Sequence, residues 1–286
     1  SCFEKALSIN SNFTEAHCNL GITFKDLGRL DDAISCYEKS LSTNPNFVEA
    51  YYNLANLLRE LGQFNEASKC YNQALRIKPN HAEAYSNLGL TLEELCQPDA
   101  AISSFERALV IKPNHHLARF NLALAQLSNG FLSEGFKNYE IRWQWENFTS
   151  HRRKFSIPRW TGESLAGKKI LIWGEQGIGD EVQFASLIPE FEKLECQVGI
   201  ECAPKLVEIF QWSFPWAEVR EAGAVNCEGS EVYSLFDYQI PMGSIAPLFR
   251  KTLDDFRIFQ KPYIPRLKEG EIKVRNKLNL QEEQLL

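Results

Sequence analysis

The sequence predicts a fold in two parts, an α-helical solenoid followed by an α/β unit built on a parallel sheet. The first observation is an internal period of 34 residues, at which Pro45, Pro79 and Pro113 recur. The second is that this period stops near residue 150. The third is that apolar runs of β type alternate with amphipathic helical runs beyond that point. This alternation is typical of a parallel sheet with crossover helices.

Length and composition exclude several classes of protein. The chain has 286 residues, 44% of them hydrophobic and 24% charged, as in an ordinary globular protein of one or two domains. A formal net charge of −6 argues against nucleic acid binding. No apolar run approaches the ~18 residues of a membrane span. Eight scattered cysteines without metal-ligand spacing indicate reduced thiols. We therefore expect a cytoplasmic protein without metal or cofactor, and we interpret the basic run His151-Arg152-Arg153-Lys154 as a solvated linker.

Small and aromatic residues recur together with the prolines. The small residues are Gly21, Ala55, Gly89 and Ala123, and the aromatic ones are Tyr37, Tyr71, Phe105 and Tyr139. This pattern resembles the tetratricopeptide repeat, in which each unit is a pair of helices. Small residues let the two helices cross closely, and the aromatic ring is expected to pack on the next helix of the stack. We place a solenoid over residues 1–149, with a partial first repeat and then units 14–47, 48–81, 82–115 and 116–149.

The turns within and between the units have their own signals. Glycine adopts a left-handed conformation at little cost, which predicts turns between paired helices at Gly28, Gly62 and Gly130. Cys96 stands at that place in the third unit, so a locally different turn is expected there. Asparagine is a good N-cap, and one follows each of the three prolines. The predicted N-caps are therefore Asn46, Asn80 and Asn114.

An asparagine recurs on the predicted first helix of each unit. Its amide carries both a donor and an acceptor, so it pairs with a peptide group of any sequence. Two interpretations stay open: the asparagines hold an extended peptide, or they are satisfied within the repeats. The repeats resemble those of O-GlcNAc transferases, whose concave asparagines bind the substrate backbone. This resemblance implies that the peptide-binding residues are Asn19, Asn53, Asn87 and Asn121.

The second part begins after a connector over residues 150–168 and occupies residues 169–286. The predicted strands are 170–173, 198–202, a weak one near Val219, and 236–240. Helical runs are expected to start near Asp180 and Pro204 and after Ser244. Ligands collect at the carboxyl ends of parallel strands. We therefore expect loops 174–180, 203–205 and 241–244 to face one crevice. The first loop has the glycine order GxxGxG, which is neither a phosphate loop nor a dinucleotide motif.

The runs PRWTGESLAGKKILIWGEQGIGDEVQFASLIP and FDYQIPMGSIAPLF resemble the acceptor-side lobe of glycosyltransferase family 9, the heptosyltransferase group. The resemblance covers roughly residues 155–266. It implies a Rossmann-like half of a GT-B fold that works without a bound metal and is truncated before the donor lobe. It also implies that Asp180 is the base for an acceptor hydroxyl. In the competing interpretation Asp180 is only a helix N-cap. The acceptor-binding residues that the family resemblance implies are Gln176, Gly177, Gly179, Gly243 and Ser244.

Two functions follow from these observations. The leading hypothesis is a fragment of a glycosyltransferase that transfers a sugar from a nucleotide sugar to a protein or glycan acceptor. Its repeats bind the acceptor or a partner, and the nucleotide sugar binds only in a longer parent protein. The alternative is a non-catalytic interaction scaffold with a degenerate transferase lobe. A nucleotide-binding oxidoreductase fits less well, because Cys202-Ala203-Pro204 stands where such enzymes carry an acidic residue.

Overall fold

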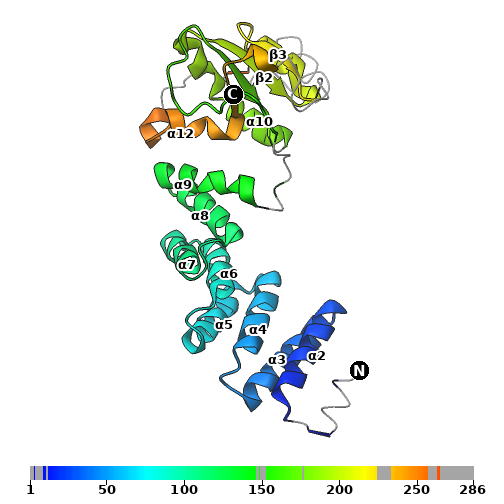
Figure 1. Cartoon of the computed structure of the whole chain (residues 1–286). Coiled ribbons are helices and arrows are strands. Elements are labelled where there is room, and N and C mark those ends of the chain that lie inside the picture. Colours follow the sequence, from blue (N-terminus) through cyan, green and yellow to red (C-terminus); the bar gives the residue numbers. More distant parts are fainter. Residues whose placement is uncertain are drawn as a thin grey trace, which may run out of the picture. The chain divides into compact units, whose positions relative to one another are not determined.

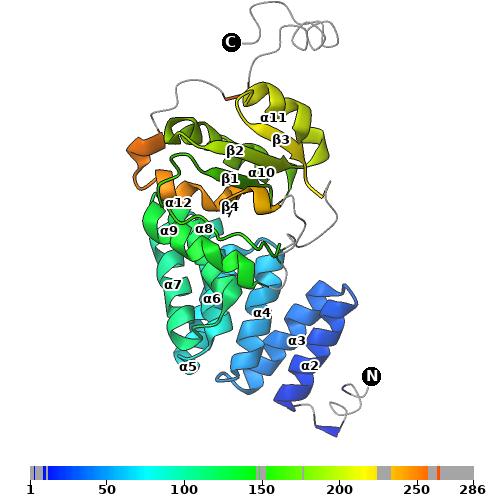
Figure 2. The same cartoon turned by 45° about the horizontal axis from the view of Figure 1, so that its top comes forward.

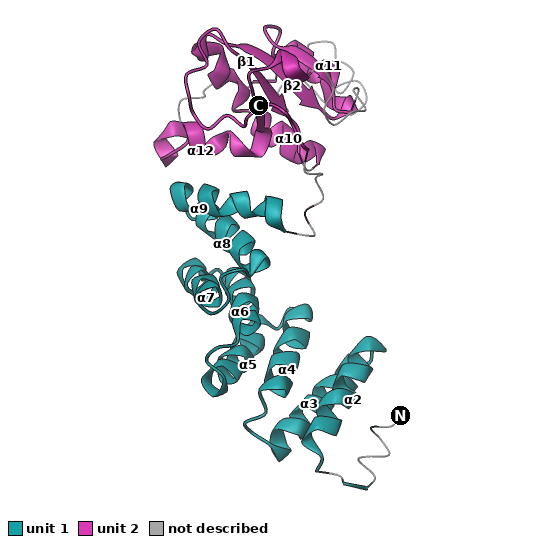
Figure 3. Ribbon diagram, viewed as in Figure 1, with its two compact units in different colours: residues 1–146 teal, residues 147–286 magenta. Residues whose placement is uncertain are grey.

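The computed structural model describes residues 3, 9–10, 12–145, 148, 153–175, 177–223, 233–256 and 263–264. The chain divides into two compact units, Ser1–Glu146 and Asn147–Leu286 (Figure 3). Each unit has its own core and is described by itself. In the described ranges, no helix combines the length and the apolar character that crossing a membrane requires.

Unit 1 consists of helices that pair with their neighbours in sequence (Figure 1). The first helices of the pairs are α2 (Thr14–Asp26), α4 (Val48–Glu60), α6 (Ala82–Glu94) and α8 (His116–Ser128). The second helices are α3 (Leu30–Thr43), α5 (Phe64–Ile77), α7 (Pro98–Ile111) and α9 (Leu132–Tyr139). Helices α3, α5 and α7 also contact the first helix of the following pair. The predicted helical solenoid is confirmed.

Close crossing of the paired helices depends on the small residues. A Cβ atom on Gly21 would lie 2.7 Å from the ring of Tyr37, and one on Gly89 would lie 2.5 Å from the ring of Phe105. Both rings are buried. Each ring therefore lies against the first helix of its own pair, whereas the sequence placed it on the next helix of the stack. The physical reason is that glycine leaves room for the ring where the two helices cross.

The turns between paired helices use the left-handed conformation. Gly28, Gly62 and Gly130 have φ of 74°, 73° and 82°, as predicted. Cys96 also has a positive φ, of 55°, although it carries a side chain. Its nitrogen donates to the Glu93 carbonyl at 2.9 Å, just as Gly62 donates to the Arg59 carbonyl at 3.0 Å. The expectation of a different turn was therefore wrong. The turn is kept, and Cys96 adopts the strained backbone.

The predicted N-caps are wrong by one residue. The N-caps of α4, α6 and α8 are Phe47, His81 and His115. Residues 45–46 form a turn, in which the side chain of Asn44 accepts from the Asn46 nitrogen at 3.0 Å. The helix therefore begins only after Phe47. The imidazole of His81 accepts from the nitrogen of Ala84 at 3.3 Å and caps α6 as an asparagine would.

The fourth helix pair is shorter than the others. Helix α9 has 8 residues, whereas α7 has 14, and the 3-10 helix η1 (Glu140–Gln144) follows it directly. Arg142 in η1 is fully buried, with its guanidinium 4.6 Å from the ring centroid of Tyr139. An ion pair with Glu140 at 2.9 Å balances its charge. Segment η1 contacts both α8 and α9, so it extends the core of unit 1 at this end.

Unit 2 is built on a four-stranded parallel sheet in the order β3-β2-β1-β4 (Figure 2). The strands are β1 (Lys169–Trp173), β2 (Gln197–Cys202), β3 (Glu218–Glu221) and β4 (Tyr238–Pro241). Ile172 lies opposite Ile200 on one side and Ile240 on the other, and all three side chains are buried. The four predicted strands and their parallel arrangement are confirmed. The connections reverse direction between β1 and β4, which is where open parallel sheets place their ligands.

Short helices lie between the strands and after β4. They are α10 (Ile178–Ala185), η2 (Ile188–Leu194), η3 (Pro204–Leu206), α11 (Val207–Ser213), η4 (Tyr233–Leu235), η5 (Met242–Ser244), α12 (Ala246–Phe249) and η6 (Leu253–Phe256). Residues 158–160, in the predicted connector, run beside β4. The Trp160 nitrogen donates to the Gln239 carbonyl at 2.9 Å, and the Gln239 nitrogen donates to the Pro158 carbonyl at 3.0 Å. The middle of the predicted connector therefore extends the edge of the sheet.

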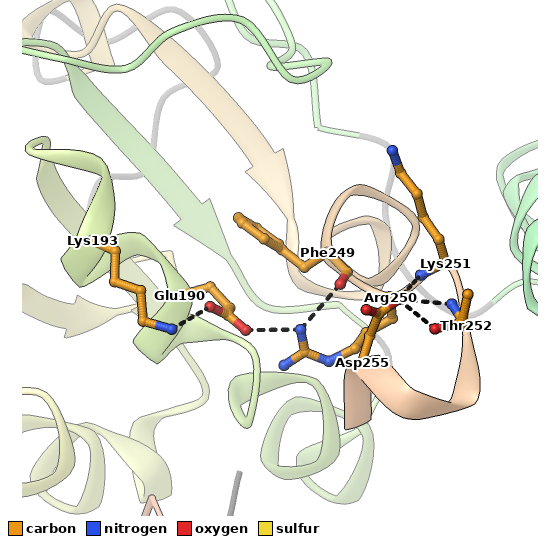
Figure 4. Close-up of polar contacts among 7 residues, drawn as sticks. All are labelled: Glu190, Lys193, Phe249, Arg250, Lys251, Thr252 and Asp255. Atoms are coloured by element: carbon orange, nitrogen blue, oxygen red, sulfur yellow. Dashed lines mark hydrogen bonds and ion pairs between the residues drawn. The ribbon is translucent and has the colours of Figure 1, made fainter. Parts of the chain in front are cut away.

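A buried ion pair joins η2 to the end of α12 (Figure 4). Arg250, which is 2% exposed, places Nη1 2.8 Å from the Glu190 carboxylate. Lys193 approaches the same carboxylate to 3.0 Å. Burial alone would raise the pKa of Glu190, but the hydrogen bonds and charges of Arg250 and Lys193 outweigh burial and lower it. The pair stabilises the packing of these segments while Glu190 is ionised.

Candidate functional site

The first candidate site is formed by three loops at the carboxyl ends of the strands of unit 2. The loop after β1 leads into α10, the loop after β2 leads into η3, and β4 leads directly into η5. These are the three loops that the sequence placed around one crevice. Backbone amides that donate hydrogen bonds to buried carboxylates link them.

Glu175 joins the first loop to the third. Its Oε1 accepts from the Gly243 nitrogen at 2.7 Å, and its side chain is 3% exposed. A methyl group on Gly243 would overlap this oxygen. Gly243 is therefore glycine because the Glu175 carboxylate fills the space beside it. Gly243 and Ser244, both predicted to bind an acceptor, are buried.

Glu181 joins α10 to the second loop. Its Oε2 accepts from the Ala203 nitrogen at 2.8 Å, and its side chain is buried. A Cβ atom on Gly174 would lie 2.5 Å from the Glu181 carboxylate, so Gly174 is also required. Burial raises the pKa of Glu181; the hydrogen bond from Ala203 opposes that rise and the charge of Asp180 adds to it. Sequence reasoning missed both glutamates, although Glu175 lies within the GxxGxG loop and Glu181 follows Asp180, because it considered only the glycines and the aspartate.

Asp180 is the third residue of α10 and not its N-cap, which is Gly177. Its Oδ2 accepts from the Gly177 nitrogen at 3.1 Å, so it stabilises the helix start from inside the first turn. A methyl group on Gly179 would meet nothing within 4 Å, and one on Gly177 would touch only Asp180 at 3.6 Å. The geometry therefore requires no glycine at either position. Gln176 lies outside the described residues.

The backbone amides of these loops are already hydrogen-bonded. The amides of Gly177, Ala203 and Gly243 each donate to a carboxylate of this chain. Carboxylates repel an anionic ligand, and amides already engaged are not available to bind one. The described side chains include no group of three or more His, Cys, Asp or Glu residues that could hold a metal ion. A neutral or cationic ligand suits this edge better than a phosphate does.

A second polar cluster lies near the same strand ends. Glu201 on β2, which is 1% exposed, lies 2.8 Å from the Nε atom of Arg220 and 2.6 Å from the Nη1 atom of Arg153. The Arg153 guanidinium also lies 5.6 Å from the ring centroid of Trp173. The interpretation of Arg153 as part of a solvated linker is therefore wrong. A buried glutamate in a strand was the available signal, because a buried carboxylate needs a cation.

The second candidate site is the set of repeating asparagines in unit 1. Asn53 donates to the sulfur of Cys18 at 3.6 Å. Asn87 donates to the Tyr52 hydroxyl at 3.2 Å and to the Asn56 side-chain oxygen at 2.9 Å. In each case the amide reaches the first helix of the preceding pair. These two asparagines therefore join adjacent repeats.

The two outer asparagines differ from the inner ones. Asn19 is exposed. Asn121 is 8% exposed, and its Nδ2 has no hydrogen-bond partner in the described ranges. The buried Ser86 hydroxyl on α6 and the Nε atom of Arg59 on α4 also lack a hydrogen-bond partner there. All three atoms lie on first helices of the pairs.

Comparison with known families identifies the repeats. Models described as tetratricopeptide repeats match residues 14–47, 82–115 and 36–67, and one described as a TPR repeat matches residues 55–95. The first two matches have the boundaries of two units read from the sequence. The chain therefore contains tetratricopeptide repeats.

Similar proteins are also found among curated sequences and solved structures. Protein FlbA of Caulobacter vibrioides is 32% identical over a match of 143 residues that covers 46% of this chain and 24% of that protein. The match thus spans about a quarter of the length of that relative. A structure titled as MamA is 28% identical with a TM-score of 0.46, covering 49% of this chain and 81% of that one. YrrB, titled as a TPR protein with an unusual peptide-binding site, is 25% identical with a TM-score of 0.47, covering 49% and 73%.

Proposed function

We propose that this chain is an interaction scaffold whose unit 1 binds an extended segment of a partner protein along its first helices. The observation that carries the proposal is the position of the unpaired polar atoms. Three such atoms, which belong to Arg59, Ser86 and Asn121, lie on the first helices α4, α6 and α8. A buried polar atom without a partner costs about 1–3 kcal/mol, which a ligand that pairs with it recovers.

An extended peptide supplies the complementary groups. Its backbone presents N–H and C=O groups alternately, so it pairs with donors such as the Asn121 amide and with acceptors alike. Asn53 and Asn87 use their amide nitrogens between repeats. Within the described residues no hydrogen bond to their side-chain oxygens is found, so these oxygens can accept from a peptide N–H. In this proposal the inner asparagines have two roles, to fix the spacing of the repeats and to accept from the bound segment.

In the same proposal unit 2 is a non-catalytic module. Its loops at the strand ends are held together by Glu175 and Glu181, whose carboxylates occupy backbone amides there. A protein that binds nucleotide phosphates uses such amides for its ligand. The internal carboxylates therefore favour a packing or docking role. A cytoplasmic location, predicted from the cysteines, stays a prediction.

A matched pair of surface substitutions tests the binding face. Leu124 on α8 is 44% exposed and Val110 on α7 is 69% exposed, so both accept a long side chain without disturbing the core. Peptides of 12 residues are first selected from a random library against the full chain. Leu124→Arg is expected to weaken binding of a selected peptide more than tenfold, and Val110→Arg less than twofold. Equal effects of the two substitutions would refute binding along the first helices.

A second candidate function is the acceptor half of a glycosyltransferase. It is favoured by the strand order β3-β2-β1-β4 and by Asp180 beside the carboxyl end of β1. In this case a longer parent protein binds the nucleotide sugar, and Asp180 or Glu181 accepts the proton of an acceptor hydroxyl. Loss of a general base costs ~10²–10⁴-fold in rate. Turnover of that parent with Asp180→Asn and with Glu181→Gln tests it, and near wild-type turnover of both variants excludes a base at either position.

A further inference from the structure

One stripe of side chains recurs on all four first helices. It contains residues at spacing i, i+4 and i+7, which lie on one face of a helix. We call it the first-helix stripe. Its members are Cys18, Ile22 and Lys25 on α2; Tyr52, Asn56 and Arg59 on α4; Ser86, Leu90 and Glu93 on α6; and Phe120, Leu124 and Leu127 on α8.

The middle member of the first-helix stripe reaches the surface on α2 and α8. Ile22 is 39% exposed and Leu124 is 44% exposed, although both are large apolar side chains. The floor of the stripe contains Ser86, which is 1% exposed and whose hydroxyl has no hydrogen-bond partner in the described ranges. Ser86 and Glu93 lie two helical turns apart on the same face of α6. The stripe therefore combines exposed apolar surface with unsatisfied polar groups, as a binding surface does.

The charge of the first-helix stripe changes along the unit. Lys25 on α2 is paired with Glu60 at 2.6 Å. Arg59 on α4 lies beside the Tyr71 hydroxyl. Glu93 on α6 is half-buried, and no hydrogen bond or ion pair of its carboxylate is found within the described ranges. Its pKa is raised by burial and by the charge of Glu94. The charged side chain of the stripe is thus a cation on α2 and α4 and a carboxylate on α6.

We propose that the first-helix stripe binds an extended partner segment carrying a lysine or arginine side chain that pairs with Glu93 and an apolar side chain that packs on Leu124. This inference rests on the proposed function and adds the chemistry of the partner. The cation forms an ion pair with the half-buried Glu93 carboxylate, which favours binding. The apolar side chain covers the exposed surface of Leu124 and removes it from water, which also favours binding. An acidic segment is repelled by Glu93 and Glu94.

Two probe peptides and a matched pair of variants test this. The probes are a fluorescein-labelled 12-residue peptide that repeats serine, leucine and lysine, and its counterpart with glutamate in place of lysine. Glu93 on α6 is compared with Glu106, an exposed glutamate on the second helix α7. We expect the lysine peptide to bind the full chain at least tenfold more tightly than the glutamate peptide, measured by fluorescence anisotropy at low salt. Glu93→Gln is expected to weaken it about tenfold, and Glu106→Gln less than twofold.

The outcomes separate this inference from the proposed function. Equal weakening by Glu93→Gln and Glu106→Gln would mean general charge attraction and would overturn the subsite at Glu93. Equal affinities for the lysine and glutamate peptides would overturn it as well. If binding of the library-selected peptide is still weakened by Leu124→Arg, the proposed function remains intact in both cases. Circular dichroism of both variants controls for folding.

Discussion

The side chain of Glu175 accepts a hydrogen bond from the backbone nitrogen of Gly243 at 2.7 Å and fills the space that a side chain at position 243 would need. This contact joins the end of β1 to the end of β4, two strands that are neighbours in the sheet. Position 243 must therefore be glycine as long as the Glu175 carboxylate occupies this place, whatever the function of the loops.

Gly243→Ala is therefore expected to destabilise unit 2. Its methyl group would overlap the Glu175 carboxylate, and overpacking of a buried site costs about 1–3 kcal/mol. Gly179→Ala is the control: it meets nothing within 4 Å and lies in a helix, so it is neutral or stabilises by up to about 1 kcal/mol. Urea unfolding followed by the fluorescence of buried Trp160 and Trp173 measures both. Similar losses in the two variants would contradict the contact.

Two substitutions of Glu181 distinguish the effect of its acceptor oxygen on stability from the effect of its charge. Glu181→Ala leaves the Ala203 nitrogen without its partner, which costs about 1–3 kcal/mol. Glu181→Gln keeps an acceptor oxygen and removes a buried charge, so it is expected to match or exceed the wild type at neutral pH.

The pH dependence of that comparison has a definite sign. The pKa of Glu181 is raised in the folded state above its ordinary value of 4.5, so the folded state binds its proton more tightly than the unfolded state does. The wild type therefore gains stability from this group as pH falls through the folded pKa. The advantage of Glu181→Gln should be greatest at neutral pH and should shrink on acidification. A constant difference between the urea midpoints at pH 7.5 and pH 5 would rule this out.

The asparagines of unit 1 should differ in their effect on stability. Asn87 bonds to two side chains of α4, whereas Asn19 is exposed. Asn87→Ala is expected to cost about 1–3 kcal/mol, because it removes these bonds and leaves the Asn56 oxygen with fewer donors. Asn19→Ala should change stability by less than about 0.5 kcal/mol. Helical circular dichroism during urea unfolding distinguishes them, and equal effects would mean that the inner asparagine does not join the repeats.

Cys96→Gly should stabilise unit 1. Cys96 has a φ of 55°, and the left-handed conformation costs a residue with a side chain about 1–2 kcal/mol that glycine does not lose. Gly62→Ala at the corresponding turn is the reverse control, since open space surrounds Gly62 and only the backbone opposes the change. The two substitutions should shift the unfolding midpoint in opposite directions. A destabilised Cys96→Gly variant would show that the thiol contributes more than the backbone strain costs.

The periodic features of the fold could be predicted from the sequence. The 34-residue period determines where helices pair, and the apolar runs at 170–173 and 198–202 lie within β1 and β2. The contacts of Glu175 and Glu181 could not be predicted, because each joins a side chain to a backbone amide far along the chain. The separation is 68 residues for Glu175 and 22 for Glu181. The N-caps were misplaced for a local reason: Asn44 and Asn46 form a turn before the helix begins. The contacts of Asn53 and Asn87 could not be predicted either, because their partners lie on the first helix of the preceding pair. The sequence of one repeat does not show which side chains lie on its neighbour.

Hydrogen exchange of the full chain with and without a library-selected peptide tests the central claim most directly. Exchange reports protection of backbone amides segment by segment. If an extended segment binds along the first helices, α4, α6 and α8 should gain protection while α5, α7 and the strand-end loops of unit 2 remain unchanged. Protection confined to the second helices, or to the loops around Gly177, Ala203 and Gly243, would contradict the account.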